Sequence, residues 1–140
     1  MQRCGMSILE LTVVLALSAI LLTVALLQIG HVRDATAVRG AVGEAAADFS
    51  AAREAALARR RPVALVIDTA AATLTARATG TIVLVSRFRQ SYGVAIATNR
   101  DSAVYDGRGL GYGISNLSLV VRRGAVAETL VVSRLGRVRW

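Results

Sequence analysis

The feature that most constrains this chain is an apolar run near its start, residues 6–29. Of its 24 residues, 18 are of apolar types, and the one charged residue is Glu10. A helix of this length extends for roughly 36 Å, enough to cross a hydrocarbon layer of about 30 Å. Arg3 precedes the run, and positive charge favours the cytoplasmic side of a membrane. The run therefore predicts a single-pass membrane helix whose short N-terminal end stays in the cytoplasm while the rest of the chain is translocated.

Two details of this run do not suit an ordinary signal peptide. The small residue Gly5 lies before the apolar run, whereas a signal peptide carries its cleavage site after it. Glu10 lies within the run, where an ionisable group costs about 2.5–3.5 kcal/mol on insertion scales. A carboxylate kept at that cost indicates a functional site with a cationic partner. The alternative is a signal anchor that tolerates one acid near its end.

The sequence from Arg3 to Leu11 resembles the start of type IV pilins and pseudopilins. The resemblance implies that residues 1–5 are a leader, that a prepilin peptidase cleaves between Gly5 and Met6, and that Met6 becomes N-methylated. It also implies that Glu10, the fifth residue after cleavage, pairs with the N-terminal amine of a neighbouring subunit during filament assembly. The same resemblance places the apolar helix in the inner membrane and the C-terminal part of the chain in the periplasm. Met6 stands where phenylalanine is commoner.

The composition excludes two other classes of protein. Apolar residues make up 54% of the 140 residues, far more than a disordered chain contains. The sequence has one cysteine, Cys4, which excludes a disulfide scaffold. Cys4 precedes the apolar run, unlike the cysteine of a lipoprotein signal, and it would leave with the leader.

Residues 34–58 predict a second stretch of the same helix. They contain eleven alanines and no proline, and alanine has the highest helix propensity. Arginines at 59–61 suit the negative end of a helix, and Pro62 prevents its continuation. We expect one long helix, with residues 30–61 as its periplasmic half; whether it bends at Gly30, Gly40 or Gly43 is open. Apolar residues recur at spacings of four and three along one face: Val38, Val42, Ala45, Phe49, Ala52 and Ala56.

Residues 62–140 predict a strand-rich domain. Arg122 to Ala125 suggest a hairpin turn between two of its strands. The glycine-dense stretch 106–113 is expected to form a surface loop, because a phosphate-cradling loop would need a helix after it. Short β-branched runs, punctuated by glycines, are expected as strands at 63–68, 73–78, 81–88, 94–97, 103–105, 117–122 and 129–133.

The whole layout resembles the GspH/FimT-type branch of minor pilins and pseudopilins. The resemblance implies an α+β, pilin-like fold, in which a long N-terminal helix, transmembrane in its first half, packs on an antiparallel β-sheet domain. The residues that carry it are Phe49, Ala52, Arg53, Ala56, Arg60, Pro62 and Val63 at the helix end, residues 104–109 in mid-domain, and residues 131–133 and 136–139 at the end of the chain.

Enzymatic readings lack the residues they need. His31 is the sequence's one histidine and Cys4 leaves with the leader, so no nucleophile–base pair remains. We expect no cofactor, no metal and no small-molecule substrate. Asn99, Asp101 and Asp106 could hold a calcium ion, but their spacing is loose, and a solvated loop is the favoured interpretation.

Positive charge is the stronger indication of a ligand. The chain carries 17 basic residues, all arginine, against nine acids, and residues 62–140 alone carry ten arginines against four acids. Arginine matches phosphate oxygens, and an aromatic ring stacks on bases. The resemblance implies DNA binding by some FimT-type relatives through a Gly-Arg-x-Arg ending. The alternative is a last strand whose arginines face solvent, with Trp140 covering an apolar patch. The candidate DNA-binding residues are Arg134, Gly136, Arg137, Arg139 and Trp140.

Two functions follow from these observations. The first is a minor pseudopilin of a type II secretion system, assembled at or near the pseudopilus tip and supporting protein export across the outer membrane. Its partners would be other pilin or pseudopilin subunits, the prepilin peptidase, the inner membrane and secreted cargo. The second is a FimT-type minor pilin of a type IV pilus that binds extracellular DNA for natural transformation.

Overall fold

The computed structural model describes residues 7–112, 116–133 and 135–140, and the chain forms two compact units. The first unit is Met1–Arg33 and the second, globular unit is Asp34–Trp140. Helix α1, Ile8–Arg59, contributes to both. It is helical at Gly30, Gly40 and Gly43, and at Gly40 an added Cβ would lie 2.8 Å from the Tyr92 ring.

Both ends of α1 are fixed by backbone hydrogen bonds. The amide of Leu11 donates to the Ser7 carbonyl at 3.1 Å, closing the first turn. At the other end Arg60 adopts a φ of 48°, which leaves the helical region, and Pro62 follows. The amides of Arg60 and Arg61 donate back to the carbonyls of Leu57 and Ala56, each at 3.3 Å. The helix therefore ends at Arg59, inside the expected arginine run.

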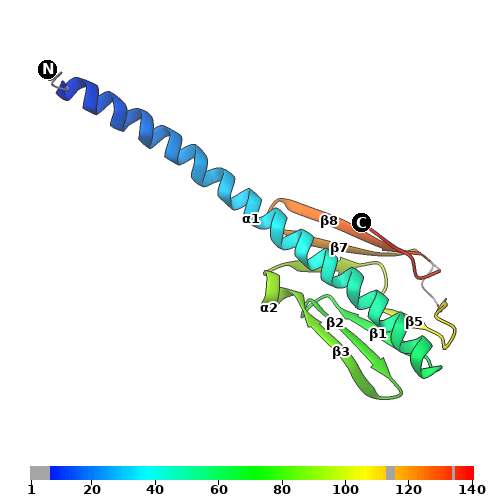
Figure 1. The fold of residues 1–140 in the computed structure, drawn as a ribbon. Helices are drawn as coiled ribbons and strands as arrows, with labels where there is room; N and C mark the ends of the chain where they lie inside the picture. Colours follow the sequence, from blue (N-terminus) through cyan, green and yellow to red (C-terminus); the bar gives the residue numbers. More distant parts are fainter. Residues whose placement is uncertain (1–6, 113–115, 134) are drawn as a thin grey trace, which may run out of the picture. The chain divides into compact units, whose positions relative to one another are not determined.

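The globular unit contains two antiparallel sheets, and the α1 segment coloured cyan to green lies across them (Figure 1). The strands of the first sheet, in spatial order, are β3 (Thr81–Arg87), β2 (Thr73–Ala78), β1 (Val63–Asp68), β5 (Ser102–Tyr105) and β6 (Gly111–Tyr112). The strands of the second are β4 (Ala95–Thr98), β7 (Leu117–Arg123), β8 (Val126–Val132) and β9 (Val138–Arg139).

The core lies between the inner faces of the strands and one stripe of α1. Every residue of the predicted stripe is buried, with Phe49 fully so. Alternate residues of β1 and β7 are buried as the pleat requires, for example Leu65 and Leu119. The structure thus confirms the expected α+β fold, a long helix packed on antiparallel sheet, and divides the sheet in two.

Short elements account for the differences from expectation. The run expected as strand through residue 88 turns into a five-residue helix, α2 (Phe88–Tyr92), which ends at Gly93 with a φ of 66°. Strands β6 and β9 have two residues each, and β8 begins at Val126 rather than 129. The predicted hairpin is present: Arg123 pairs with Val126 around a two-residue turn.

Candidate functional site

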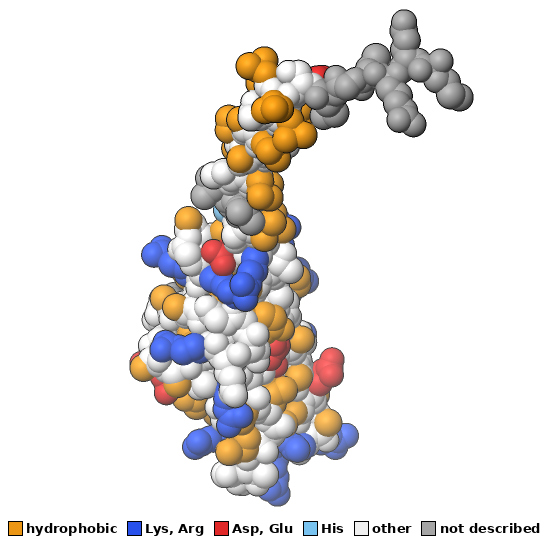
Figure 2. Space-filling view, turned by 90° about the vertical axis from the view of Figure 1, so that its left-hand side faces the viewer, with side chains coloured by type: hydrophobic (Ala, Val, Ile, Leu, Met, Phe, Trp, Pro, Cys, Tyr) orange, Lys and Arg blue, Asp and Glu red, His pale blue; other side chains and the backbone are white. Residues whose placement is uncertain are grey.

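The first candidate site is the apolar start of α1, where the described side chains of residues 7–33 are exposed. Figure 2 shows hydrophobic side chains covering this part of the helix. Within the described residues, α1 is the one helix long and apolar enough to cross a membrane. Exposed apolar surface of this extent requires lipid or another protein to cover it.

Glu10 lies in the first turn of α1 and is exposed. A negative charge there is favoured by the helix dipole and by the free amides of the first turn. Glu10 makes no hydrogen bond or ion pair with another described residue, whereas the hydroxyls of Ser18 and Thr23 each donate to a helix carbonyl at 2.8 Å. The carboxylate is therefore available to a partner outside the described residues. Gly5 and Met6, the expected processing site, lie outside the described residues.

The second candidate site is the C-terminal segment. After β8 the chain turns: the amide of Gly136 donates to the Ser133 carbonyl, and that of Ser133 to the Arg137 carbonyl, both at 2.9 Å. Strand β9 then pairs Arg139 with Val131. Within this segment Val138 is half-buried while Arg137 and Arg139 are exposed. Trp140 is 69% exposed.

The C-terminal segment thus presents two exposed arginines and an exposed indole, the groups expected to contact DNA, and of these the indole lines a groove with Val138 and α1. Arg134 lies outside the described residues.

Gly136 in this motif is required by packing. Its φ is 72°, a conformation that favours glycine, and an added Cβ would lie 3.2 Å from the Tyr105 ring and 3.3 Å from Cδ of Arg53. Tyr105 is fully buried, and burial raises the pKa of its hydroxyl to about 12, with Arg53 acting in the opposite direction. Nε of Arg53 in turn donates to the carbonyl of Gly109 at 3.0 Å. Gly136 is therefore part of the fold, and the arginines that follow it are the groups free to bind.

The glycine-dense loop packs against the end of α1. Oδ1 of Asp106 accepts the amides of Arg108 and Leu110 at 2.9 and 2.8 Å. A Cβ on Gly107 would lie 2.7 Å from the carbonyl carbon of Arg60. Residues 111–112 of the stretch expected as loop form the short strand β6. Residues 106–110 form a turn, and its glycines allow close approach to the helix.

The three residues weighed as a calcium site have other roles or are exposed. The Asn99 side chain accepts the Ser118 amide and donates to the Asn116 carbonyl, both at 2.9 Å. Oδ1 of Asp106 binds the loop amides, and Asp101 is exposed. In the part of the chain that the structure describes, no three His, Cys, Asp or Glu residues lie close enough together to hold a metal.

One carboxylate of α1, that of Asp48, is buried. Asp48 is 4% exposed, and its Oδ2 has no hydrogen-bond partner among the described residues. Burial raises the pKa of Asp48 to about 6; a hydrogen bond with Ser86 acts against this shift, and the nearby Glu44 adds to it. Glu44 also accepts a hydrogen bond from Tyr92, which raises the pKa of that phenol. This cluster lies in the helix–sheet interface and was not identified from sequence, because nothing near Asp48 in the chain marks it as buried.

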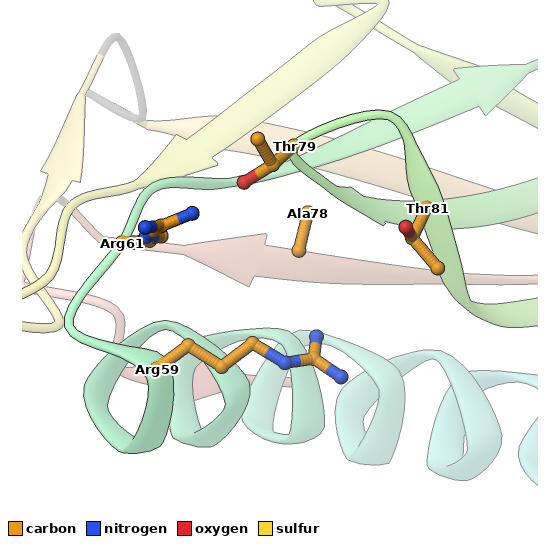
Figure 3. Close-up of a pocket in the computed structure, with 5 residues that line it drawn as sticks. All are labelled: Arg59, Arg61, Ala78, Thr79 and Thr81. Atoms are coloured by element: carbon orange, nitrogen blue, oxygen red, sulfur yellow. The ribbon is translucent and has the colours of Figure 1, made fainter.

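Sequence reasoning also missed two hollows in the surface. An open pocket of about 380 Å³ lies between the end of α1 and the β2–β3 turn (Figure 3), lined by Arg59, Arg61, Ala78, Thr79 and Thr81. A groove of about 420 Å³ is lined by small residues of α1 and by the C-terminal strand: Gly43, Ala46, Ala47, Ser50, Gly136, Val138 and Trp140. From the sequence, the arginines at 59–61 were explained by the helix dipole alone. Their neighbours Thr79 and Thr81 could not be predicted, because the β2–β3 hairpin brings them to the helix end.

Comparison with solved structures gives the fold a counterpart. The chain is similar to the type IV minor pilin FimU of Pseudomonas aeruginosa strain PAO1 in one crystal form, with a TM-score of 0.62 and 15% identity, covering 73% of this chain and 86% of FimU. In a second crystal form the TM-score is 0.59 and the identity 14%, covering 73% and 90% of the two chains. No family model and no curated protein sequence matches this chain. The chain therefore has a type IV minor pilin-like fold.

Proposed function

We propose that this chain, which has the fold of a type IV minor pilin, is a membrane-anchored minor subunit of a pilus-like filament. Residues 6–29 would anchor it in the inner membrane, and after cleavage between Gly5 and Met6, with N-methylation of Met6, Glu10 would dock on the N-terminal amine of a neighbouring subunit. In the resulting filament the globular unit would contact other subunits. For the system we propose the type II secretion pseudopilus, at or near its tip.

The observation that carries this proposal is the free carboxylate in an exposed apolar helix. The other polar side chains described between residues 12 and 23 are satisfied within the helix, so they insert into an apolar phase at low cost. Glu10 lies just before them in the helix and is charged, and its carboxylate has no partner in the described part of the chain. A carboxylate placed inside a membrane is stabilised by pairing with a cation. For Glu10 that cation would come from another molecule.

The assembly role is tested by replacing Glu10 in the full chain. We expect Glu10→Gln to leave leader cleavage unchanged and to reduce incorporation into filaments at least tenfold, measured as the ratio of subunit in sheared filaments to subunit in membranes. Glu10→Asp keeps the charge and should retain part of the incorporation. The matched control is Ser18→Ala, which removes a polar group in the same segment without removing a charge. Normal incorporation of Glu10→Gln would overturn the docking proposal.

The system is tested in the source strain by deletion and complementation. Loss of protein export with intact DNA uptake supports the secretion pseudopilus. Loss of DNA uptake with intact export contradicts it and supports the type IV pilus instead.

The second candidate function is capture of extracellular DNA by a minor pilin. It is favoured by the exposure of Arg137, Arg139 and Trp140. Each guanidinium that neutralises a phosphate releases counterions, so the affinity for DNA falls as salt rises, with a slope of about −0.9 per phosphate contact. The arrangement is suited to contacts with the backbone of DNA and to stacking on a base.

A salt series on the full chain in non-ionic detergent tests DNA capture. We expect the double variant Arg137→Ala, Arg139→Ala to lower the slope of log affinity against log salt by about two. The control removes the same charge from exposed arginines elsewhere, Arg87→Ala with Arg89→Ala, and should leave the slope nearly unchanged. Absence of duplex binding at low salt would remove this function.

A further inference from the structure

A pair of arginines at the end of α1 shares one pocket with two hydroxyls. Arg59 ends the helix, and Arg61 follows two residues later. Both line the open pocket of about 380 Å³, together with Thr79 from the β2–β3 turn and Thr81, the first residue of β3. In Figure 3 the Thr79 hydroxyl is turned toward the side where Arg61 lies, and Ala78 lies above the guanidinium of Arg59. The pocket therefore combines two positive charges with two hydroxyl donors on a small, flat floor.

The two guanidinium groups have no partner within the described chain. The ion pairs found among the described residues are Arg39–Glu128 and Arg123–Asp34, and neither reaches this pocket. The acids of the strand-rich region that make contacts are engaged elsewhere: Asp68 accepts the Ala71 amide and Asp106 accepts two loop amides. Two like charges that line one pocket, with no acid paired to either among the described residues, favour an anion from outside the chain.

The helix end itself does not use these guanidinium groups for capping. The carbonyls of Ala56 and Leu57 accept the backbone amides of Arg61 and Arg60. Each guanidinium therefore keeps its five donors free, in the fork geometry that matches phosphate oxygens.

We propose that this pocket binds a phosphate monoester dianion. Two guanidinium charges balance the two negative charges of the dianion, whereas a carboxylate offers only one. The Thr79 and Thr81 hydroxyls would donate to the remaining phosphate oxygens. The pocket is open to solvent, so it leaves room for the rest of the molecule that carries the phosphate. This site differs from the C-terminal arginines and does not depend on filament assembly.

The test uses the full chain in non-ionic detergent, with methyl phosphate as the soluble probe. Binding is followed by the arginine Nε–Hε signals in two-dimensional NMR at pH 7.5 and constant ionic strength. We expect saturable shifts at Arg59 and Arg61, and at least tenfold weaker binding of acetate. Thr79→Val should weaken methyl phosphate binding about tenfold, the loss expected for one hydrogen bond to a charged group.

Matched variants separate a built site from general positive charge. Arg59→Gln with Arg61→Gln should abolish saturable binding, while Arg87→Gln with Arg89→Gln removes the same charge and should change affinity less than twofold. Equal losses in both double variants would overturn the proposal, as would binding of acetate as tight as that of methyl phosphate. Unchanged far-ultraviolet circular dichroism shows that each variant is folded.

A second arm identifies the source of the phosphate. The Nε–Hε signals of Arg59 and Arg61 are compared between nanodiscs that contain phosphatidic acid and nanodiscs of phosphatidylcholine. Binding of free methyl phosphate assigns the site to soluble monoesters, and binding only to phosphatidic acid assigns it to a lipid headgroup. Binding of neither probe overturns the proposal, and this outcome leaves the Glu10 test of assembly unaffected.

Discussion

Arg123 on β7 donates from Nε to Oδ1 of Asp34 on α1 across 2.9 Å. The same guanidinium donates through Nη1 to the carbonyl of Tyr92, at the end of α2. Gly124 follows in the hairpin turn, where an added Cβ would lie 2.6 Å from Oδ2 of Asp34. One arginine thus joins the long helix, the short helix and the β7–β8 hairpin at the residue where the globular unit begins.

The Arg123–Asp34 pair is expected to contribute measurably to stability, because each side chain is only about a quarter exposed (25% and 29%). A double-mutant cycle with Arg123→Met and Asp34→Asn should give a coupling free energy of about 1 kcal/mol. The measurement is urea unfolding of the full chain in detergent, followed by near-ultraviolet circular dichroism. The matched cycle is Arg39–Glu128, where the distance is 3.4 Å and Arg39 is 76% exposed, and its coupling should be near zero. Equal couplings in the two cycles would contradict the role of burial.

Asp48 is expected to make the free energy of unfolding depend on pH. Burial raises its pKa from 3.8 to about 6, so the folded state favours the protonated carboxyl. Its contribution to stability is fully present below about pH 4 and is lost as the pH rises through about 6. The difference corresponds to on the order of 3 kcal/mol. Asp48→Asn mimics the protonated form and should raise the unfolding free energy at pH 7.5 while changing it little at pH 4.

The control for Asp48 is Glu54→Gln, which removes an exposed carboxylate from the same helix. Because this side chain is exposed, Glu54→Gln should change the unfolding free energy at pH 7.5 much less than Asp48→Asn does. A pH-independent effect of Asp48→Asn would show that the pKa of this carboxyl is the same in the folded and unfolded states, which its burial argues against.

Gly107 is expected to tolerate no side chain. Alanine there would place Cβ 2.7 Å from the backbone of Arg60, which cannot move without shifting the end of α1. We expect Gly107→Ala to lower the unfolding free energy by about 1–3 kcal/mol. At Gly43 an added Cβ meets nothing within 4 Å, and alanine is the better helix former. Gly43→Ala should therefore stabilise the chain by about 0.5–1 kcal/mol, and destabilisation there would contradict the open position found on α1.

Trp140 is expected to matter little for stability. It is 69% exposed, so Trp140→Ala should change the unfolding free energy by less than about 0.5 kcal/mol. Phe49→Ala, at a fully buried position on α1, should cost about 3–5 kcal/mol. As the sequence's one tryptophan, Trp140 also reports its own surroundings: its fluorescence should be quenched efficiently by acrylamide in the folded protein. Poor quenching would show that the indole is covered.

The helix and the better strands could be predicted because their patterns are long. Six apolar residues at helical spacing defined the buried face of α1, and the bounds of β1 and β2 agree with the β-branched runs. The start of β8 was set too late, because Ala127 is exposed and Glu128 is charged and half-buried, and both dilute its hydrophobic pattern. Strand β9 has two residues and forms because β8 offers a neighbour, which no local pattern records.

The candidate functional residues divide along similar lines. Glu10, Arg137 and Arg139 stood out because charge in an apolar run, or at a chain end, is visible in sequence. The pocket of Arg59 with Thr79 was invisible, since twenty residues separate its two sides. Asp48 was invisible because its burial depends on the packing of α1 in the folded unit, where it forms a hydrogen bond with Ser86 of β3.

The packing of Gly136 against Tyr105 and Arg53 bears on how related chains should be compared. The glycine of the Gly-Arg-x-Arg ending is held by the fold, and it would persist in a chain that binds no nucleic acid. The side chains of Arg137 and Arg139 are not part of that packing, so the fold does not require arginine at these two positions. A comparison of related sequences that scores the whole motif would therefore detect the shared fold. Scoring the two arginine positions separately, among chains that have the glycine, would instead test for a shared ligand.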